Sequence, residues 1–396
     1  MITNEYSKHW LLDSEIDFLN HGSFGASPIP VLEKQNYYRE LMEKEPVAYF
    51  IRKFDELYYN AKKALAEFVS ANTDDIVFVP NATHGVNAIL HSLNFNPDDE
   101  LLTTNHVYGA CKNLMNYICK RTGAKLVIAD VPFPIKKDEE VTEAVLSKVN
   151  DKTKIALIDH ITSPTGLIFP VEQIVKELSA KGIDTIVDGA HALGSIPLNV
   201  ESIGAAYYTA NCHKWLCAPK GAAFLYVRPD KQKEIHPAII SHPHVDHPAN
   251  PHSQFQSEFY WTGTNDFSAY LCVPEAIKFM DSLMEGGIKK LMGRNRNLSL
   301  KVREMISEVL SIEPAAPKDM LASLCSFPLP DGSDPGPFPF DYIDPVQDLL
   351  YVDYKIEIPV MFFPAPPNRL IRTSVQIYNF LEQYQKLADA LKEIFG

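Results

Sequence analysis

The chain has 396 residues, 46% of them hydrophobic and 22% charged, a composition typical of a globular protein with two or three domains. Its 50 acidic side chains outnumber its 37 basic ones, which gives a formal net charge of −13 at pH 7. We find no segregated basic patch, and a chain this acidic repels phosphate backbones. Nucleic acid is therefore not expected as a partner.

The N-terminus and the cysteines both indicate a soluble protein of a reducing compartment. Residues 1–18 mix charged and apolar side chains and lack the apolar core of a signal peptide. No window offers the ~18 consecutive apolar residues that a membrane-spanning helix needs. Six cysteines without a CxxC pair favour neither a disulfide scaffold nor a structural zinc site. We expect a cytoplasmic location and no membrane partner.

From about residue 75, short apolar runs alternate with longer amphipathic stretches, which predicts an α/β fold with a mainly parallel sheet. Helical stretches follow the first three strands, and Gly123 and Gly182 are expected to end two of these helices. The predicted strands are 75–80, 101–104, 154–160, 184–191, 205–210 and 221–227.

The pattern changes twice towards the C-terminus. Segments 236–252 and 327–345 are rich in His and Pro or in Pro and Gly, and both are predicted to be loops. Helical patterns cover 267–284, 288–310 and 379–395. We expect an N-terminal arm (1–20), a large domain (21–280) and a smaller α+β domain (281–396).

Two residues in the segment 187–227 suggest cofactor chemistry. Asp188 ends one predicted strand and Lys214 follows another, and open α/β sheets bind ligands at strand ends. Pyridoxal phosphate needs a carboxylate that keeps its pyridine nitrogen protonated and a lysine that anchors its aldehyde. Taken singly, Asp188 could cap a turn and Lys214 could be solvated.

A possible phosphate site lies between a strand and a helix at 80–90. The first turn of such a helix offers unpaired N–H groups and a positive dipole end, and the Thr83 hydroxyl is a further donor. On its own, Asn81 or Thr83 could equally be an ordinary helix cap.

Six motifs together resemble the class V aminotransferase family of pyridoxal-phosphate enzymes, and most closely its isopenicillin N epimerase-like branch. That branch includes hercynylcysteine sulfoxide lyases and cysteine desulfhydrases. The resemblance spans nearly the whole chain and implies fold type I with bound pyridoxal 5'-phosphate. The motifs are LNHGSFGASP (19–28), NATHGVN (81–87), VDGAHALG (187–194), NCHKW (211–215), YWTGTND (260–266) and IRTSVQIYN (371–379).

The resemblance assigns roles around the cofactor. Lys214 would anchor the aldehyde and Asp188 would pair with the ring nitrogen, while Tyr108, with His106 as the alternative, would stack on the ring. Phosphate contacts are implied for Ala82, Thr83, Asn211 and His213, and contacts near the phenolic oxygen for His191 and Ser163.

The resemblance also implies a partner subunit and a substrate. Thr264 matches a threonine that reaches the phosphate of the neighbouring subunit, so a homodimer with shared sites is expected. Arg372 matches the arginine that clamps the carboxylate of an α-amino acid by a two-pronged hydrogen bond. The mouth of the same site is assigned to Asn20, His21 and Gly22.

The reaction depends on the fate of the substrate after Lys214 removes its Cα proton. We favour β-elimination at a C–S bond, which needs only this one base; epimerisation and transamination remain alternatives, and a non-catalytic binding protein is a more remote one. A nicotinamide reductase is disfavoured because no GxGxxG follows a strand.

Desulfurases related to the family attack sulfur with a loop cysteine, and the corresponding stretch 357–368 has none. Cys325 is expected to pack in the small domain, which makes persulfide formation an unlikely reaction for this chain. The histidines at 236, 242, 244, 247 and 252 lack the regular spacing of a metal motif, so no metal is expected.

Overall fold

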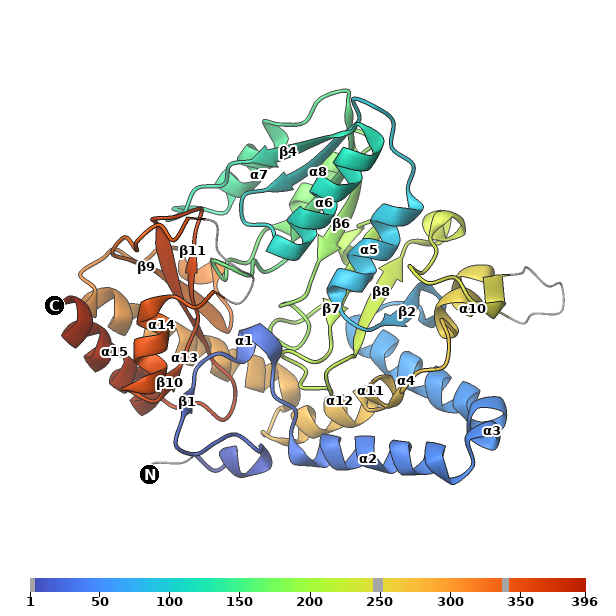
Figure 1. Cartoon of the computed structure of the whole chain (residues 1–396), viewed down its shortest axis with the longest axis horizontal. Helices are drawn as coiled ribbons and strands as arrows, with labels where there is room; N and C mark the ends of the chain where they lie inside the picture. The colour runs from blue at the N-terminus through green and yellow to red at the C-terminus, as the bar shows by residue number, and fades with distance from the viewer. Residues whose placement is uncertain (1–3, 245–251, 337–341) are drawn as a thin grey trace.

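A computed structural model describes residues 4–244, 252–336 and 342–396 and has a seven-stranded sheet at its centre (Figure 1). Strand β8 runs antiparallel to both of its neighbours, and the other pairs are parallel, as the sequence predicts. In spatial order the strands are β2 (Ile76–Val79), β8 (Ala223–Val227), β7 (Tyr207–Asn211), β6 (Asp184–Asp188), β5 (Thr153–Asp159), β3 (Glu100–Thr104) and β4 (Lys125–Ala129).

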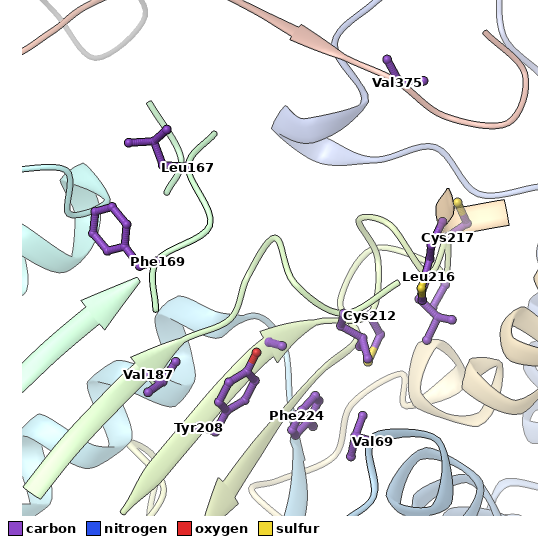
Figure 2. Close-up of a cluster of buried hydrophobic side chains, with 14 of the residues drawn as sticks. Val69, Leu167, Phe169, Val187, Tyr208, Cys212, Leu216, Cys217, Phe224 and Val375 are labelled. Atoms are coloured by element: carbon purple, nitrogen blue, oxygen red, sulfur yellow. The ribbon is translucent and has the colours of Figure 1, made fainter. Parts of the chain in front are cut away.

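Helices cover both faces of this sheet, because successive strand residues point to opposite sides and both sides are apolar. On one face, Val77 and Val79 pack with α5 (Ala82–Ser92) and α6 (Gly109–Thr122). On the other face, strand residues pack with α4 (Phe54–Val69) and α8 (Val171–Ser179). Figure 2 shows part of this second cluster, with Val187, Tyr208 and Phe224 on neighbouring strands.

Each predicted strand overlaps a strand of the sheet, but β4 was not predicted. This edge strand starts with an exposed lysine, and its next three residues are only partly buried. It therefore lacks the continuous apolar run of the buried strands. The predicted strand 184–191 ends three residues early, at Asp188, where the chain turns towards Gly189 and Ala190.

A smaller three-stranded antiparallel sheet, β11 (Val360–Phe362), β12 (Arg369–Ser374) and β9 (Leu324–Leu329), forms beside the large one. Helices α13 (Gly287–Val309) and α15 (Leu381–Phe395) pack together, and α13 also contacts β9. The N-terminal strand β1 (Asp17–Phe18) pairs with β10 (Ile356–Glu357). The division into an arm, a large domain and a small domain at residues 20 and 280 stays a prediction.

The helical patterns at 267–284, 288–310 and 379–395 correspond to α11 with α12, to α13 and to α15. The predicted loop 327–345 overlaps the end of β9, where apolar residues pair with β12 despite Pro328. The remaining helices are α1 (His21–Phe24), α2 (Ile29–Lys44), α3 (Pro46–Ala48), α7 (Glu139–Leu146), α9 (Val200–Ile203), α10 (Gln254–Tyr260), α11 (Ser268–Leu271), α12 (Val273–Ser282) and α14 (Pro345–Val352).

Two questions raised by the sequence concern metals and membranes. Within the described ranges, no three His, Cys, Asp or Glu side chains gather as a metal site would require, and His247 lies outside those ranges. The helices of the described chain include none with the length and apolar character needed to cross a membrane.

Candidate active site

The carboxyl ends of β5, β6 and β7 open into one cavity of about 330 Å³, in the position where parallel sheets bind ligands. The last residues of these strands are Asp159, Asp188 and Asn211, and all three line the cavity. Among the residues predicted from the sequence, the wall also contains Lys214, Tyr108, His191, His213, Ala82, Thr83 and Ser163.

The Lys214 amine is buried and lies 3.0 Å from Nε2 of His191. Burial lowers the pKa of Lys214 to about 7, and the charge of Arg372 acts in the same direction. Trp215 donates its indole N–H to Nδ1 of His191 at 3.4 Å, and an indole can only donate. The hydrogen of the neutral imidazole therefore sits on Nε2 and points to the Lys214 nitrogen, which suits a free-base amine.

The backbone around Lys214 is held by the N-terminal motif. His21 is fully buried between the Tyr378 hydroxyl, 2.7 Å from Nδ1, and the Lys214 carbonyl oxygen, 3.0 Å from Nε2. Gly25 has φ +69°, and a Cβ there would lie 2.0 Å from the His213 carbonyl oxygen. The motif LNHGSFGASP thus positions the lysine from a distance of nearly two hundred residues along the chain.

Asp188 is buried, and each of its carboxylate oxygens has a donor. The Ala190 N–H lies 3.0 Å from Oδ1, and the Cys111 thiol lies 3.5 Å from Oδ2. Burial raises the pKa of Asp188, while the Ala190 N–H and the Lys214 charge oppose that rise. Asp188 is thus an anion prepared to receive a cationic group in the cavity.

The N-terminus of α5 forms another part of the wall. Asn211 Oδ1 accepts the Ala82 N–H at 2.9 Å, and Asn81 caps the helix by accepting the His84 N–H. Thr83, between them, has neither its N–H nor its hydroxyl bonded to any described residue. His213 donates from Nδ1 to the Ala222 carbonyl at 3.1 Å, which leaves Nε2 for a ligand. This end of the cavity suits an anion such as phosphate.

The structure separates the two candidates for ring stacking. Tyr108 lines the cavity and is 44% exposed. His106 is fully buried outside the wall, bonded to Thr165 Oγ1 at 2.7 Å and to the Val131 carbonyl at 3.1 Å. Tyr108 therefore remains the prediction for the ring contact, and His106 has a structural role.

Arg372 lies directly behind the cavity wall. Its Nη1 donates to the Ser163 carbonyl and hydroxyl, and its Nη2 donates to Ser23 Oγ at 3.2 Å. Its Nε has no hydrogen-bond partner among the residues that the structure describes. Burial lowers its pKa to about 10, so the guanidinium stays charged at neutral pH. A buried cation with an unsatisfied donor is an unusual arrangement that a carboxylate ligand would complete.

None of the predicted mouth residues lines the described cavity: Asn20 and Gly22 lie near Arg372, whereas His21 contacts the Lys214 carbonyl. Asn20 accepts the Ser23 hydroxyl at 2.5 Å and donates to Glu357 at 2.9 Å. A Cβ on Gly22 would lie 3.5 Å from Nη2 of Arg372. Ser23 and Phe24, which follow them, are on the wall instead.

Two other residues from the sequence analysis lie outside the cavity wall. Thr264 is exposed and does not line the cavity. Cys325 is buried in β9 opposite Thr373, in the small sheet where it was expected.

The wall residues that sequence reasoning missed include Ser23, Phe24, Asp159 and Lys220. Asp159 could have been found by the rule that selected Asp188, because it too ends a predicted strand. Ser23 and Phe24 adjoin the motif residues that were assigned to the mouth. Lys220 carried no signal of its own.

The combined arrangement suits an aldehyde cofactor with a cationic ring and a phosphate. A free-base amine can attack an aldehyde carbon, a buried carboxylate can pair with a protonated ring nitrogen, and unpaired donors at α5 can bind phosphate. Each of these groups is present in the one cavity. The residues therefore fit pyridoxal phosphate.

Comparison with known proteins identifies the relatives of the chain. Residues 26–335 match the family profile Aminotransferase class-V. The chain is 27% identical to "Putative L-cysteine desulfhydrase 1" of Oryza sativa subsp. japonica, over 99% of this chain and 85% of that protein. It is 28% identical to "Isopenicillin N epimerase" of Streptomyces clavuligerus, over 98% and 96% of the two chains.

A solved structure shares the fold. A C-DES mutant with glycine covalently linked to its PLP cofactor superposes with a TM-score of 0.81, at 19% identity, over 98% of this chain and 100% of that one. The fold predicted from the resemblance is confirmed.

Proposed function

Because the chain belongs to the aminotransferase class-V family, we propose that it is a pyridoxal-phosphate enzyme that cleaves the carbon–sulfur bond of a cysteine derivative. Family membership confirms the resemblance found in the sequence and supports the cofactor. The observation that carries the proposal is the buried Lys214 amine, held 3.0 Å from a neutral His191 in the same cavity as Asp188.

When bound, pyridoxal phosphate supplies an electron sink for the electrons of a bond broken at Cα. Lys214 would hold the cofactor aldehyde, and its freed amine would accept the Cα proton at Nζ. Asp188 keeps the ring nitrogen protonated. The α5 N-terminus, Asn211 and His213 would hold the phosphate, and Tyr108 would cover the ring.

The substrate's carboxylate is held by Arg372, whose Nε is the free buried donor behind Ser163 and Ser23. In the net reaction, water and a cysteine thioether or sulfoxide give pyruvate, ammonia and the thiol or sulfenic acid. The Cα–H proton goes to Lys214, and the Cβ–S bond breaks with its electron pair leaving on sulfur.

Epimerisation is the second candidate, and Tyr108 favours it. Burial raises the pKa of the Tyr108 phenol, so the group keeps its proton at neutral pH and could deliver one from the ring face that it covers. Elimination remains our proposal because it needs one base only, and because the relative in Oryza sativa carries the name of a desulfhydrase.

A panel of amino acids, assayed with and without a keto acid, tests the proposal. We expect cysteine thioethers or sulfoxides to release pyruvate and ammonia without a keto acid. Amino transfer only in its presence would instead identify an aminotransferase, and Cα deuterium exchange with inversion and no pyruvate an epimerase. Protein that binds the cofactor but turns over none of the panel would favour a binding protein.

Lys214→Ala provides the control for this assay and should abolish turnover in folded protein. Borohydride reduction should fix the cofactor on Lys214. Recovery of the label on another lysine would contradict the assignment of the cofactor lysine.

The proposal includes a homodimer in which Thr264 contacts the partner's phosphate. Its support is the motif YWTGTND together with the exposure of Thr264 in a Gly-containing turn. Thr264→Ala should weaken cofactor retention by about tenfold, the loss of one hydrogen bond to a charged group. Thr262→Ala is the matched control. A monomer in sedimentation that retains the cofactor normally would overturn this part.

A further inference from the structure

A second carboxyl group, that of Asp159, lies beside Asp188 at the same end of the cavity. The two residues are the last of their strands and are Cα partners across the parallel pair β5 and β6. Leu157 and Ile186, two residues earlier on the same strands, pack on the α5 and α6 face, so both aspartates point to that face. Both line the cavity, with 3% and 4% exposure.

The two carboxyl groups differ in what surrounds them. Both oxygens of Asp188 have donors, and these hydrogen bonds favour its ionised form. Among the described residues, Asp159 Oδ2 has no hydrogen-bond partner, and Asp159 takes part in no ion pair. Only two backbone N–H groups, those of Tyr108 and of Asp159 itself, favour the ionised form of its carboxyl group.

The groups that face Asp159 from the packed elements bring no positive charge. Asp188 faces it from β6, Cys111 from α6 and Tyr108 from the loop before α6. Burial, followed by the charge of Asp188, raises the pKa of Asp159 well above its ordinary range. Two adjacent buried carboxyl groups cannot both ionise without a counter-charge, and the one with an unsatisfied oxygen and no cation keeps the proton.

We propose that Asp159 is a positioning residue of this site, which stays a neutral carboxylic acid beside ionised Asp188 and bonds the Tyr108 backbone. The site thereby presents one negative charge to the cofactor ring. This inference rests on the proposed function, because it assigns Asp188 to the ring nitrogen of the cofactor.

Infrared spectroscopy of the holoprotein at neutral pH tests the proton directly, since a neutral carboxylic acid and a carboxylate have separate C=O stretches. The wild-type band of a neutral carboxylic acid should disappear in Asp159→Asn and persist in Asp184→Asn, whose carboxylate pairs with Arg228 and Lys231. If Asp159→Asn leaves the band unchanged, the proposal is overturned.

Cofactor binding gives the second readout. Asp159→Asn keeps a donor of similar size, whereas Asp159→Ala removes it. The dissociation constant of pyridoxal phosphate should rise at least tenfold more in Asp159→Ala than in Asp159→Asn. An Asp159→Asn variant that binds cofactor as weakly as Asp188→Asn would show that a charge, not a proton, is needed at this position.

Two further controls separate the possible failures. If Asp159→Ala does not fold, as judged by circular dichroism, the infrared result with the near-isosteric Asp159→Asn decides alone. If the wild-type protein binds no pyridoxal phosphate, the proposed function fails, whereas the carboxylic acid band in cofactor-free protein still tests the proton on Asp159.

Discussion

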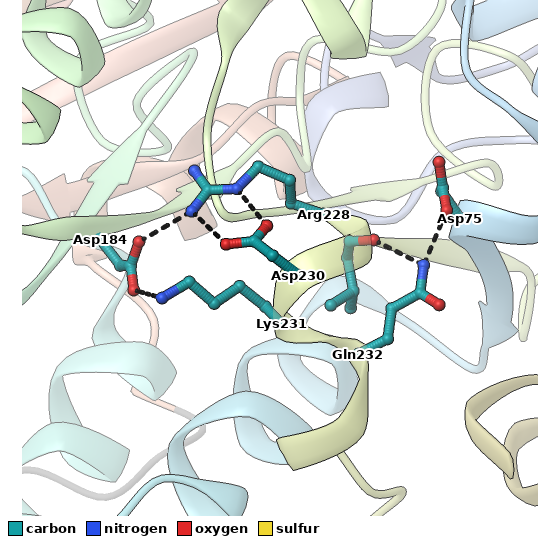
Figure 3. A network of polar contacts seen from close by, with 7 residues as sticks. Asp75, Asp184, Arg228, Asp230, Lys231 and Gln232 are labelled. Atoms are coloured by element: carbon teal, nitrogen blue, oxygen red, sulfur yellow. Dashed lines mark hydrogen bonds and ion pairs between the residues drawn. The ribbon is translucent and has the colours of Figure 1, made fainter.

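Strand β6 carries an aspartate at each end, and the two carboxylates differ in their ion-pair partners. At the amino end, Asp184 pairs with Arg228 at 3.3 Å and with Lys231 at 2.5 Å, and Arg228 also pairs with Asp230 (Figure 3). At the carboxyl end, Asp188 has no ion pair among the described residues, and Asp159, Lys214 and Arg372 are buried near it.

The contrast separates charges that serve the fold from charges that serve a ligand. The Asp184 group is partly exposed and satisfied within the protein, so each pair contributes at most about 1 kcal/mol. At the carboxyl end, the cost of burying the charged groups is only partly offset, because Asp159 Oδ2 and Arg372 Nε lack hydrogen-bond partners in the described part of the chain. A ligand that brings complementary charges offsets this cost when it binds.

The largest expected effect comes from replacing each of the two aspartates of β6 with asparagine in a separate variant. Asp188→Asn removes the charge that holds a proton on the cofactor ring and should lower kcat/KM by roughly 10²–10⁴. Asp184→Asn removes a partly exposed surface charge and should leave turnover within about threefold. Steady-state assays at equal cofactor content measure both. Equal losses in the two variants would contradict the distinction between the sheet ends.

Two arginines of β12 show the same contrast within one strand: one has a carboxylate partner in the protein and the other does not. Nη1 of Arg369 donates to both carboxylate oxygens of Asp344, at 2.8 and 3.0 Å, in a largely buried ion pair. Arg372 has no carboxylate partner in the described chain. Arg372→Ala should lower kcat/KM by about 10²-fold, mainly through KM, with little loss of stability.

Arg369→Ala should do the reverse, because it leaves the Asp344 carboxylate buried and unpaired. We expect a loss of roughly 3 kcal/mol in the free energy of unfolding and nearly normal kinetics per folded molecule. Thermal unfolding and kinetics on the same samples distinguish the two results. A KM that rises equally in both variants would remove Arg372 from the substrate site.

The sequence was sufficient where the signal is local. Buried strands are continuous apolar runs between turn residues, so β2, β5, β6, β7 and β8 could be located, and motif spacing placed Lys214 and Asp188 together. The sequence was insufficient to locate the edge strand β4, because its early residues are only partly buried and do not form a continuous apolar run.

The parts of the site that could not be predicted depend on tertiary contacts. The Arg372 guanidinium is held by Ser23 and Ser163, which are 349 and 209 residues away in sequence. Whether His106 or Tyr108 faces the cavity depends on the turn between β3 and α6, which no spacing rule fixes. Asp159 follows the same strand-end rule as Asp188, but only the three-dimensional pairing shows two buried carboxyl groups side by side.

The smallest expected effect concerns stability without cofactor. The pKa of Lys214 is about 7 in the folded protein and 10.5 ordinarily, so between these values the unfolded chain binds more protons. The stability of the cofactor-free protein should therefore rise as pH increases from 7 to 10.5. Lys214→Met removes this burial cost and should stabilise that protein by roughly 1–3 kcal/mol at pH 7, with the difference narrowing towards pH 10.

Lys231→Met is the matched control for this measurement, because Lys231 is already paired with Asp184 at the other end of β6. Its effect should stay within about 1 kcal/mol. Urea unfolding of both cofactor-free variants at pH 7 and pH 10 gives the four free energies needed. If Lys214→Met gains nothing at pH 7, or if its gain grows with pH, then the Lys214 amine is not a desolvated free base. In that case the uncompensated charge at the carboxyl end of the sheet would have to be attributed to Asp188 and Arg372 alone.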